Sequence, residues 1–239
     1  MNSMNLKLGT LFLIPSSIEQ NENVSFLLTE QKKNLKHVKY FIVENEKIAR
    51  KTIKALDLNT KIQAITLYKH RNKSNQKDIE ESLSPIFKGN DIGLLSDSGS
   101  PCVADPGSKI VEYAHINQIK IKPLIGPSSI ILGLMASGFN GQKFKFHGYI
   151  PIKKNDKDRY IKKMMLSIKY DNETQIFIET PYRNNQMLKD LLEILNHKNK
   201  LCVAINLTGS EEKIISDSVI NWQRKNIDLD KKLCIFFIN

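Results

Sequence analysis

Short runs of hydrophobic residues alternate with longer segments of mixed polarity through the first half of the chain. The runs are rich in β-branched and aromatic residues and are bounded by polar or turn residues, which predicts strands at residues 10–14, 40–43, 63–67, 92–95 and 119–124. Between them, hydrophobic residues spaced three and four positions apart predict amphipathic helices at residues 47–56, 77–87 and 108–117. Because strands that alternate with helices are joined by right-handed crossovers, this half is predicted to form a mainly parallel five-stranded sheet.

The pattern changes after Gly126 and Pro127, a pair that is typical of turns. A helix of small residues is predicted at residues 128–137 and an aromatic strand at residues 144–149. Further helices are predicted at residues 157–168 and 184–195, and further strands at residues 174–178, 201–206, 212–216 and 232–238. This order predicts a second α/β domain with a mixed sheet, so the predicted domains are residues 1–124 and 125–239.

In a parallel sheet, ligands bind beyond the carboxyl ends of the strands, so the loops that follow the predicted strands are the candidate sites. The loop after the first strand begins with Pro15 and Ser16 and has no glycine through residue 19. A dinucleotide site or an ordinary Rossmann methyltransferase would have a glycine-rich turn there, and no Walker A motif is present either. The sequence therefore disfavours these common nucleotide-binding classes.

The loop after the fourth predicted strand is rich in small residues, which let a ligand approach the backbone. Within it, Asp97 offers a charged acceptor for hydroxyl or ammonium groups, although an aspartate here could also serve only to form the turn. Asp105 precedes Pro106 and is either the N-cap of the next helix or a further site residue.

Three other positions carry polar side chains at predicted strand ends or helix starts. Ser128 and Ser129 open the helix after Gly126, where they could cap it or contact a ligand. Residues 179–183 (ETPYR) bring a carboxylate, a hydroxyl and a guanidinium to another strand end. Glu44 follows the second strand, where an acid also suits the start of a helix.

The composition narrows the function classes. No hydrophobic run approaches the ~18 residues that a membrane span needs, and the first run is too short for a secretory signal, so a cytoplasmic location without membrane contact is expected. The histidines lack the pairwise spacing of metal ligands and the three cysteines lack a CxxC, so neither a metal site nor a disulfide framework is predicted.

A net charge of +11 is compatible with a polyanionic partner. The strongest candidate for an RNA track is residues 143–163, where lysines and arginines are interleaved with aromatic residues. The alternative is a solvated helix face in a lysine-rich protein.

Several strings along the chain resemble the tetrapyrrole methylase superfamily, the two-domain methyltransferases that use S-adenosylmethionine. The most specific strings are residues 96–106 (SDSGSPCVADP), 123–139 (PLIGPSSIILGLMASGF) and 146–151 (FHGYIP). They are similar to the branch that methylates a ribose 2′-hydroxyl of cytidine in small-subunit ribosomal RNA, here in a short form. The resemblance implies two α/β domains with a cofactor cleft between them, and a homodimer.

The resemblance also implies roles for individual residues. It places the methyl donor, S-adenosylmethionine, against Pro15, Asp97, Gly99, Ser100, Ser128, Ser129, Ile130, Ile178, Glu179, Asn206 and Leu207. The acceptor is expected to be ribosomal RNA or the small ribosomal subunit. The candidate acceptor contacts are Ser16, Asp105 and Arg183 in the loops after strands, and Lys153 and Lys154 in the basic stretch of residues 143–163. Glu44 is the candidate to orient or partly deprotonate the acceptor hydroxyl, and no metal is expected because displacement at a sulfonium depends chiefly on alignment.

Two other functions stay open on the sequence. One is methylation of a small acceptor, such as a tetrapyrrole precursor whose carboxylates would suit the spread basic charge, or of a modified protein residue. The other is a catalytically silent relative that only binds RNA.

Overall fold

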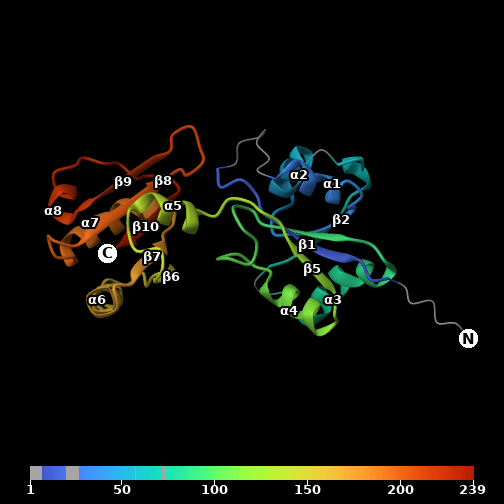
Figure 1. Ribbon diagram of the computed structural model, residues 1–239, viewed down its shortest axis with the longest axis horizontal. Helices are drawn as coiled ribbons and strands as arrows, with labels where there is room; N and C mark the ends of the chain where they lie inside the picture. The colour runs from blue at the N-terminus through green and yellow to red at the C-terminus, as the bar shows by residue number, and fades with distance from the viewer. Residues whose placement is uncertain (1–6, 20–26, 57, 72–73) are drawn as a thin grey trace, which may run out of the picture. The chain divides into compact units, whose positions relative to one another are not determined.

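The chain divides into two units, Met1–Pro127 and Ser128–Asn239 (Figure 1). The computed structural model describes residues 7–19, 27–56, 58–71 and 74–239.

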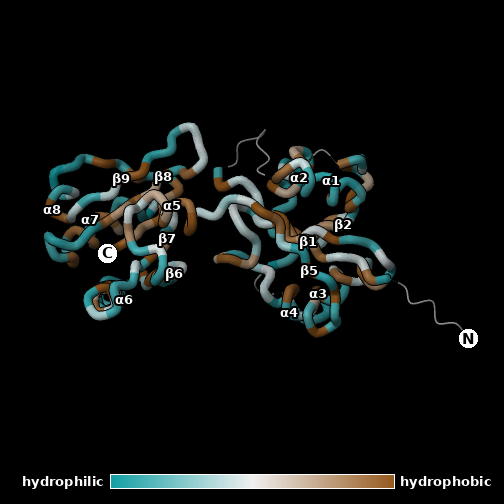
Figure 2. Tube along the Cα trace, viewed as in Figure 1, coloured by the Kyte–Doolittle hydropathy of each residue, from teal (hydrophilic) through white to brown (hydrophobic). Residues whose placement is uncertain are grey.

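The first unit is built on a five-stranded sheet in which every pair of neighbouring strands is parallel. Across the sheet the strands are β3 (Thr66–Lys69), β2 (Tyr40–Val43), β4 (Ile92–Leu95), β1 (Thr10–Ile14) and β5 (Lys120–Pro123). The strand β4, at the centre of the order, is buried along its whole length, as expected for a strand covered on both faces. Figure 2 shows hydrophobic residues gathered along these strands.

The helices of the first unit bury one face each against the sheet. The helices α1 (Thr29–Leu35) and α2 (Glu46–Ala55) pack in one hydrophobic cluster, to which they contribute Leu35, Ala49 and Ile53. The helices α3 (Gln76–Leu83) and α4 (Ser108–Ile116) pack in a second cluster. Short 3-10 helices, η1 (Ile62–Ala64) and η2 (Ser84–Lys88), lie in the connections.

The second unit is built on a mixed five-stranded sheet. Its strands, in order across the sheet, are β6 (Phe144–Tyr149), β7 (Thr174–Ile178), β10 (Cys234–Ile238), β8 (Lys200–Ile205) and β9 (Lys213–Ser218). Only the β6–β7 pair is parallel. The helix α5 (Ser129–Ser137) packs on β8, β9 and β10, while α6 (Lys154–Asp171) and α7 (Asn184–Ile194) contribute to the core that contains Phe177 and Phe236.

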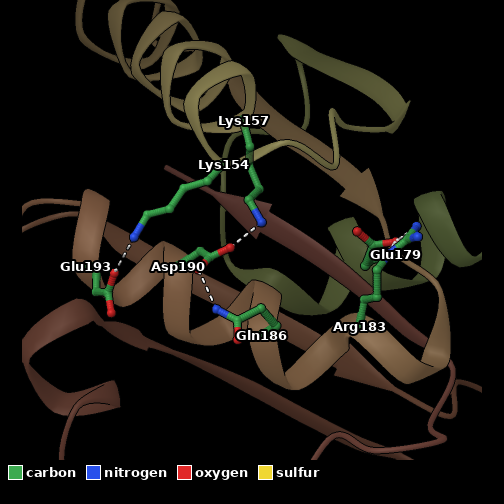
Figure 3. A network of polar contacts seen from close by, with 7 residues as sticks. All are labelled: Lys154, Lys157, Glu179, Arg183, Gln186, Asp190 and Glu193. Atoms are coloured by element: carbon green, nitrogen blue, oxygen red, sulfur yellow. Dashed lines mark hydrogen bonds and ion pairs between the residues drawn. The ribbon is translucent and has the colours of Figure 1, made fainter.

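A buried ion pair joins α6 to α7 (Figure 3). Lys157 on α6 pairs with Asp190 on α7, and both side chains are buried. The Gln186 side chain donates a further hydrogen bond to Asp190 at 2.7 Å. Because an unpaired charge at this depth would cost several kcal/mol, the two helices are held in one register.

The predicted fold class is confirmed, since a parallel sheet is followed by a mixed sheet and helices cover both. The strands at 10–14, 40–43, 92–95, 144–149 and 174–178 have the predicted bounds.

The differences in bounds have local causes. The third strand begins at Thr66 rather than at residue 63, because residues 62–64 form η1. The helix predicted to residue 87 ends at Leu83, because Pro85 lies in the separate turn η2.

In the second unit, the last strand begins at Cys234 rather than at residue 232, because Lys231 takes a positive φ of 58° and turns the chain. The helices α1 and α8 (Val219–Trp222) were not predicted; α1 buries Leu35 alone and so lacks a hydrophobic period.

The close approach of α5 to the sheet gives a test of this packing. A Cβ atom at Gly133 would lie 2.4 Å from Cζ of Phe237, which is fully buried. We expect Gly133→Ala to lower the free energy of unfolding by about 1–3 kcal/mol, the usual effect of overpacking, although alanine is the better helix former. Urea denaturation measures this, with Gly141→Ala as the matched control because a Cβ atom there would meet nothing within 4 Å. Equal stability of the two variants would contradict the close packing of α5.

Candidate functional site

In the first unit, the predicted residues lie at one edge of the sheet. Pro15 follows β1, Glu44 follows β2 and Asp97 lies just beyond β4. Because these three strands are parallel and adjacent, their carboxyl ends meet at the same edge.

Two backbone hydrogen bonds join the loop after β1 to the loop after β4. The Ser16 N–H donates to the Gly99 carbonyl at 2.9 Å, and the Gly99 N–H donates to the Ser16 carbonyl at 3.1 Å. Gly99 has a φ of +71°, which favours glycine over residues with a side chain. The loop after β4 is therefore folded back over the end of β1.

Ser96 holds the two ends of this loop together. Its hydroxyl contacts Asp105 Oδ2 and the Ser98 carbonyl, and accepts a hydrogen bond from the Ser98 N–H. Its backbone carbonyl accepts a hydrogen bond from the Ser16 hydroxyl. The interpretation of Asp105 as a helix N-cap is wrong, because Gly107 occupies the N-cap position of α4 and the Asp105 side chain turns to Ser96 instead.

The loop also contains residues in an unfavourable backbone conformation. Cys102 and Ala104 have φ values of 66° and 61°, in the left-handed region that residues with a Cβ rarely adopt. Such strain persists only where the surrounding structure enforces it, and it is common at functional sites.

Three carboxylates gather at this edge and interact electrostatically. Burial raises the pKa of Asp97, with an opposing hydrogen bond from the Asn45 N–H at 3.3 Å. Burial raises the pKa of Glu44 most, and the negative charges of Asp97 and Asp105 raise it further. The positive charge of Arg71 lowers it. Burial also raises the pKa of Asp105. The hydrogen bond from Ser96 lowers this pKa, and the charge of Asp97 raises it further. A concentration of acids with raised pKa values is typical of sites that bind cationic groups or transfer protons.

The segment that leaves β5 packs against the same edge. A Cβ atom at Gly126 would lie 2.1 Å from Cγ of Pro15, so a side chain cannot fit there without movement. The Ser100 hydroxyl donates to the Pro127 carbonyl at 3.2 Å. Pro15 and Ser100 thus fix the path of the chain that leads out of the first unit.

In the second unit, the predicted residues lie at the carboxyl ends of β7 and β8. Both strands are antiparallel to β10, so Ile178 and Ile205 end at the same edge of the sheet. Asn206 exchanges hydrogen bonds with Leu233, through its backbone N–H at 2.8 Å and its side-chain oxygen at 2.9 Å. Leu207 is buried beside it, and the buried hydroxyl oxygen of Thr208 has no hydrogen-bond partner among the described residues.

Glu179 and Arg183 form a pair at the end of β7 (Figure 3). The Glu179 side chain is only 3% exposed, and its Oε1 accepts from the Thr180 N–H at 2.6 Å and from Arg183 Nε and Nη2 at 3.0 and 2.6 Å. This hydrogen bonding to Glu179 raises the pKa of Arg183. From the sequence, Glu179 was predicted to contact the methyl donor and Arg183 to contact the acceptor.

The start of α5 carries the remaining donor candidates. Ser128 occupies the N-cap position, and its side chain makes no capping hydrogen bond. Ser129 and Ile130 follow in the first turn. The backbone N–H groups of such a turn point outward with a partial positive charge, which suits a carboxylate ligand.

The lysine candidates of α6 differ from one another. Lys153 occupies the N-cap of α6, is exposed, and has no ion pair among the described residues. Lys154 lies 3.8 Å from Glu193. Lys157 was expected on the basic track of residues 143–163, and this is wrong because the side chain is buried against Asp190.

Three residues at these edges were missed by the sequence analysis: Ser96, Asn45 and Thr208. Asn45 caps α2 by accepting from two backbone N–H groups while its own N–H contacts Asp97. A serine or asparagine beside a predicted strand end was the available signal, but it is common in ordinary turns.

Within the described ranges, no cluster of three or more histidine, cysteine or acidic side chains has the arrangement of a metal site. The described helices also include none with the length and hydropathy of a membrane span.

Comparison with known proteins identifies relatives along nearly the whole chain, although no family model matches. The ribosomal RNA small subunit methyltransferase I of Buchnera aphidicola subsp. Schizaphis graminum is 30% identical over 235 residues, which cover 97% of this chain and 78% of that protein. The protein of the same name from Bacillus subtilis is 30% identical over 92% of this chain and 72% of its own length. Among solved structures, the methyltransferase CobJ has a TM-score of 0.61 at 15% identity, covering 97% of this chain and 94% of CobJ, and it shares the fold.

The coupling of the three carboxylates can be measured. We expect Asp97→Asn to lower the pKa values of Glu44 and Asp105, because the charge of Asp97 raises both. Titration of the side-chain carboxyl carbons by nuclear magnetic resonance would record the shifts. Glu80→Gln, on the exposed face of α3, is the control and should leave both pKa values unchanged. A Glu44 pKa that stays the same in Asp97→Asn would show that the two groups are not coupled.

Proposed function

We propose that this chain, which belongs to the family of ribosomal RNA small subunit methyltransferase I, methylates the RNA of the small ribosomal subunit. The chain is a methyltransferase and uses S-adenosylmethionine as its methyl donor. The observation that carries the RNA substrate is the 30% identity to a relative of that name over 97% of the chain. We further propose a ribose 2′-hydroxyl as the acceptor atom.

The residues of each unit fit the functional groups of the donor. S-adenosylmethionine carries an ammonium group and two ribose hydroxyls, which donate hydrogen bonds, and a carboxylate, which accepts them. In the first unit, Asp97 Oδ1 has only the long contact from Asn45 among the described residues, so the carboxylate keeps acceptor capacity. In the second unit, the uncapped first turn of α5 offers N–H donors, and Thr208 Oγ1 is a buried polar atom without a partner among the described residues. When bound, the donor supplies a methyl group on a positively charged sulfur.

Glu179 contributes a buried hydrogen-bond acceptor. Its Oε1 is occupied by Thr180 and Arg183, and Oε2 has no hydrogen bond among the described residues. Glu179 is therefore proposed to accept a hydrogen bond from the donor through Oε2, with Arg183 fixing its orientation.

Glu44 is the proposed group that receives or orients the proton of the acceptor hydroxyl. It is exposed at the sheet edge, and its raised pKa makes it a better proton acceptor than an ordinary glutamate. Asp105 lies in a neighbouring loop and is proposed to contact the acceptor. Ser16 was expected to do so as well, but it is 4% exposed and its hydroxyl donates to the Ser96 carbonyl, so we propose that it holds the loop in place instead. No metal ligand is needed for this arrangement.

The basic residues that could contact RNA phosphates are fewer than the sequence suggested. Of the eight in residues 143–163, Lys143, Lys154, Lys157 and Arg159 pair with acids. The four that remain are Lys145, Lys153, Lys162 and Lys163, which have no ion pair among the described residues. We propose that the phosphate contacts come chiefly from this subset.

The assembly and location follow from the same proposal. A homodimer is proposed from the resemblance to the methylase superfamily, and a ribosomal substrate implies a cytoplasmic location. Met135 and Ile131 on α5 are 74% and 48% exposed, which supplies apolar surface that a second copy could cover.

Methyl transfer to ribosomal particles tests the proposed substrate. We expect the protein to transfer labelled methyl from S-adenosylmethionine to isolated small ribosomal subunits, because its relatives are named for that substrate. Mass spectrometry of the digested nucleosides should find the label on a ribose. Large subunits serve as the control acceptor. Label on a base would overturn the 2′-hydroxyl, and no label on any RNA would favour a small acceptor.

The role of Glu44 has its own test. We expect Glu44→Gln to lower kcat by about 10²-fold, the usual lower range for loss of a general base, with the affinity for S-adenosylmethionine retained. The wild-type rate should rise with pH through the raised pKa of Glu44 and level above it, because only the ionised carboxylate accepts a proton. Steady-state rates across a pH series measure both effects. Glu46→Gln, at the first residue of α2, is the matched control. A wild-type rate in Glu44→Gln would remove this role.

A further inference from the structure

Large apolar side chains are exposed where β6 and β7 leave the second sheet. Tyr149 ends β6 and pairs in register with Ile178, which ends β7. Because the two strands are parallel, the segments that follow them emerge at the same edge. Tyr149 is 60% exposed, Ile152 is 63% exposed and Tyr182 is 77% exposed. Two tyrosines and an isoleucine are thus exposed beside a strand whose first four residues are buried.

The short helix that carries Tyr182 is held firmly in place. It is η3 (Pro181–Arg183), and the Pro181 carbonyl accepts from the Lys231 N–H at 3.3 Å. Just beyond it, the Asn184 side chain donates to the Lys232 carbonyl at 2.8 Å. The exposure of Tyr182 therefore belongs to a fixed turn and not to a loosely held loop.

Arg183 follows Tyr182 in the chain, and Tyr149 is near enough to affect its electrostatics. Its guanidinium is fixed by Glu179 (Figure 3) yet remains 39% exposed. The hydrogen bonds to Glu179, and with a smaller effect the nearby Tyr149, raise the pKa of Arg183. A fixed, planar guanidinium beside aromatic rings is a surface on which a nucleobase can stack.

The charge around the tyrosines favours a polyanion. Lys153 follows directly after Ile152 and has no ion pair among the described residues. Of the nearby acids, Glu179 is paired with Arg183, and Asp156 lies 3.9 Å from Arg159. The exposed aromatic surface is thus accompanied by uncompensated positive charge, which suits a nucleic-acid strand better than an apolar protein face.

We propose that Tyr149 and Tyr182 stack against unpaired nucleotides of the RNA substrate, and that Lys153 contacts the adjoining phosphate. Single-stranded RNA is commonly recognised by stacking of its bases on tyrosine rings and arginine planes, which depends little on sequence. This surface would add affinity for the RNA through residues other than those proposed to contact the donor. The inference rests on the proposed function, because it assigns RNA contacts for the same substrate.

The experiment compares side chains that differ in one property. In Tyr149→Leu with Tyr182→Leu the surface stays apolar and loses its rings, whereas Tyr149→Phe with Tyr182→Phe keeps the rings. Tyr170→Leu is the matched control, because Tyr170 is 73% exposed and lies at the other end of α6 from Lys154. The probes are a fluorescein-labelled single-stranded 12-nucleotide oligocytidylate and isolated small ribosomal subunits.

The expected result separates stacking from simple apolar contact. The double leucine variant should bind the oligonucleotide at least about tenfold more weakly, since each stacked base contributes a factor of that order. The double phenylalanine variant and Tyr170→Leu should bind within about twofold of the wild type. All variants should bind S-adenosylmethionine with the wild-type affinity, measured by calorimetry, which also reports correct folding. Lys153→Gln should reduce the slope of log affinity against log salt concentration by about 0.7.

The outcomes distinguish this inference from the proposed function. The stacking surface is overturned if the double leucine variant binds RNA with the wild-type affinity. It is also overturned if the double phenylalanine variant loses as much RNA affinity as the leucine variant. Both conclusions hold even if the wild-type protein methylates small subunits. A change of mass in light scattering with unchanged RNA affinity also overturns it, and identifies a contact between copies of the chain. Loss of binding in the leucine variant alone supports the surface, even if no methyl reaches the small subunit and the proposed function fails. An unchanged salt slope in Lys153→Gln contradicts the phosphate contact.

Discussion

The candidate site in the first unit depends on the two backbone hydrogen bonds between Ser16 and Gly99. They hold the loop after β4 against the end of β1, and this places Ser96 where its hydroxyl reaches Asp105 and its carbonyl receives the Ser16 hydroxyl. Ser16 is 4% exposed, so these polar groups would be expensive to leave unpaired. The loop therefore has one low-energy path, and the three carboxylates keep fixed relative positions before any ligand binds. Preorganised groups of this kind lose little free energy when a ligand arrives.

The second unit depends in a similar way on the buried pair of Lys157 and Asp190. Burial opposes the charged form of Asp190, but hydrogen bonds from Lys157 and Gln186 keep its pKa below the usual 3.8. Because this pKa is lower in the folded state, the pair stabilises the fold above about pH 4, and that contribution is lost as the pH falls through the depressed pKa. Replacing one partner alone would leave a buried charge unpaired, which commonly costs about 3–5 kcal/mol. The pair thus fixes α6 on α7, and with them the segments that follow β6 and β7.

The sequence predicted those features that depend on short-range pattern. Strands such as β1 and β4 consist mainly of short apolar runs with sharp polar ends, so their bounds were predictable. The positions of Asp97 and Glu44 at strand ends also followed from chain order and parallel pairing. The contacts between side chains that are distant in sequence could not be predicted in this way. Asp105 could be predicted as a helix cap because Pro106 follows it, but the nearby Ser96 hydroxyl competes for its carboxylate. Lys157 belongs by composition to a basic face, and only the packing of α6 on α7 shows that it is buried.

The distribution of charge connects the two halves of the proposed function. The protein carries a net charge of +11, yet the strand ends of the first unit bring together three acids whose pKa values are raised. Such an edge repels phosphates, so it suits the ammonium and hydroxyl groups of a donor and the proton of an acceptor hydroxyl better than an RNA backbone. Attraction for RNA must then come from basic and aromatic residues elsewhere, such as Lys153, which has no ion pair among the described residues, and the exposed Tyr149 and Tyr182. Separating the acidic chemistry from the contacts that attract the polyanion lets both act without cancelling each other. A site that merged them would lose either its proton acceptor, through pairing with lysine, or its affinity for RNA.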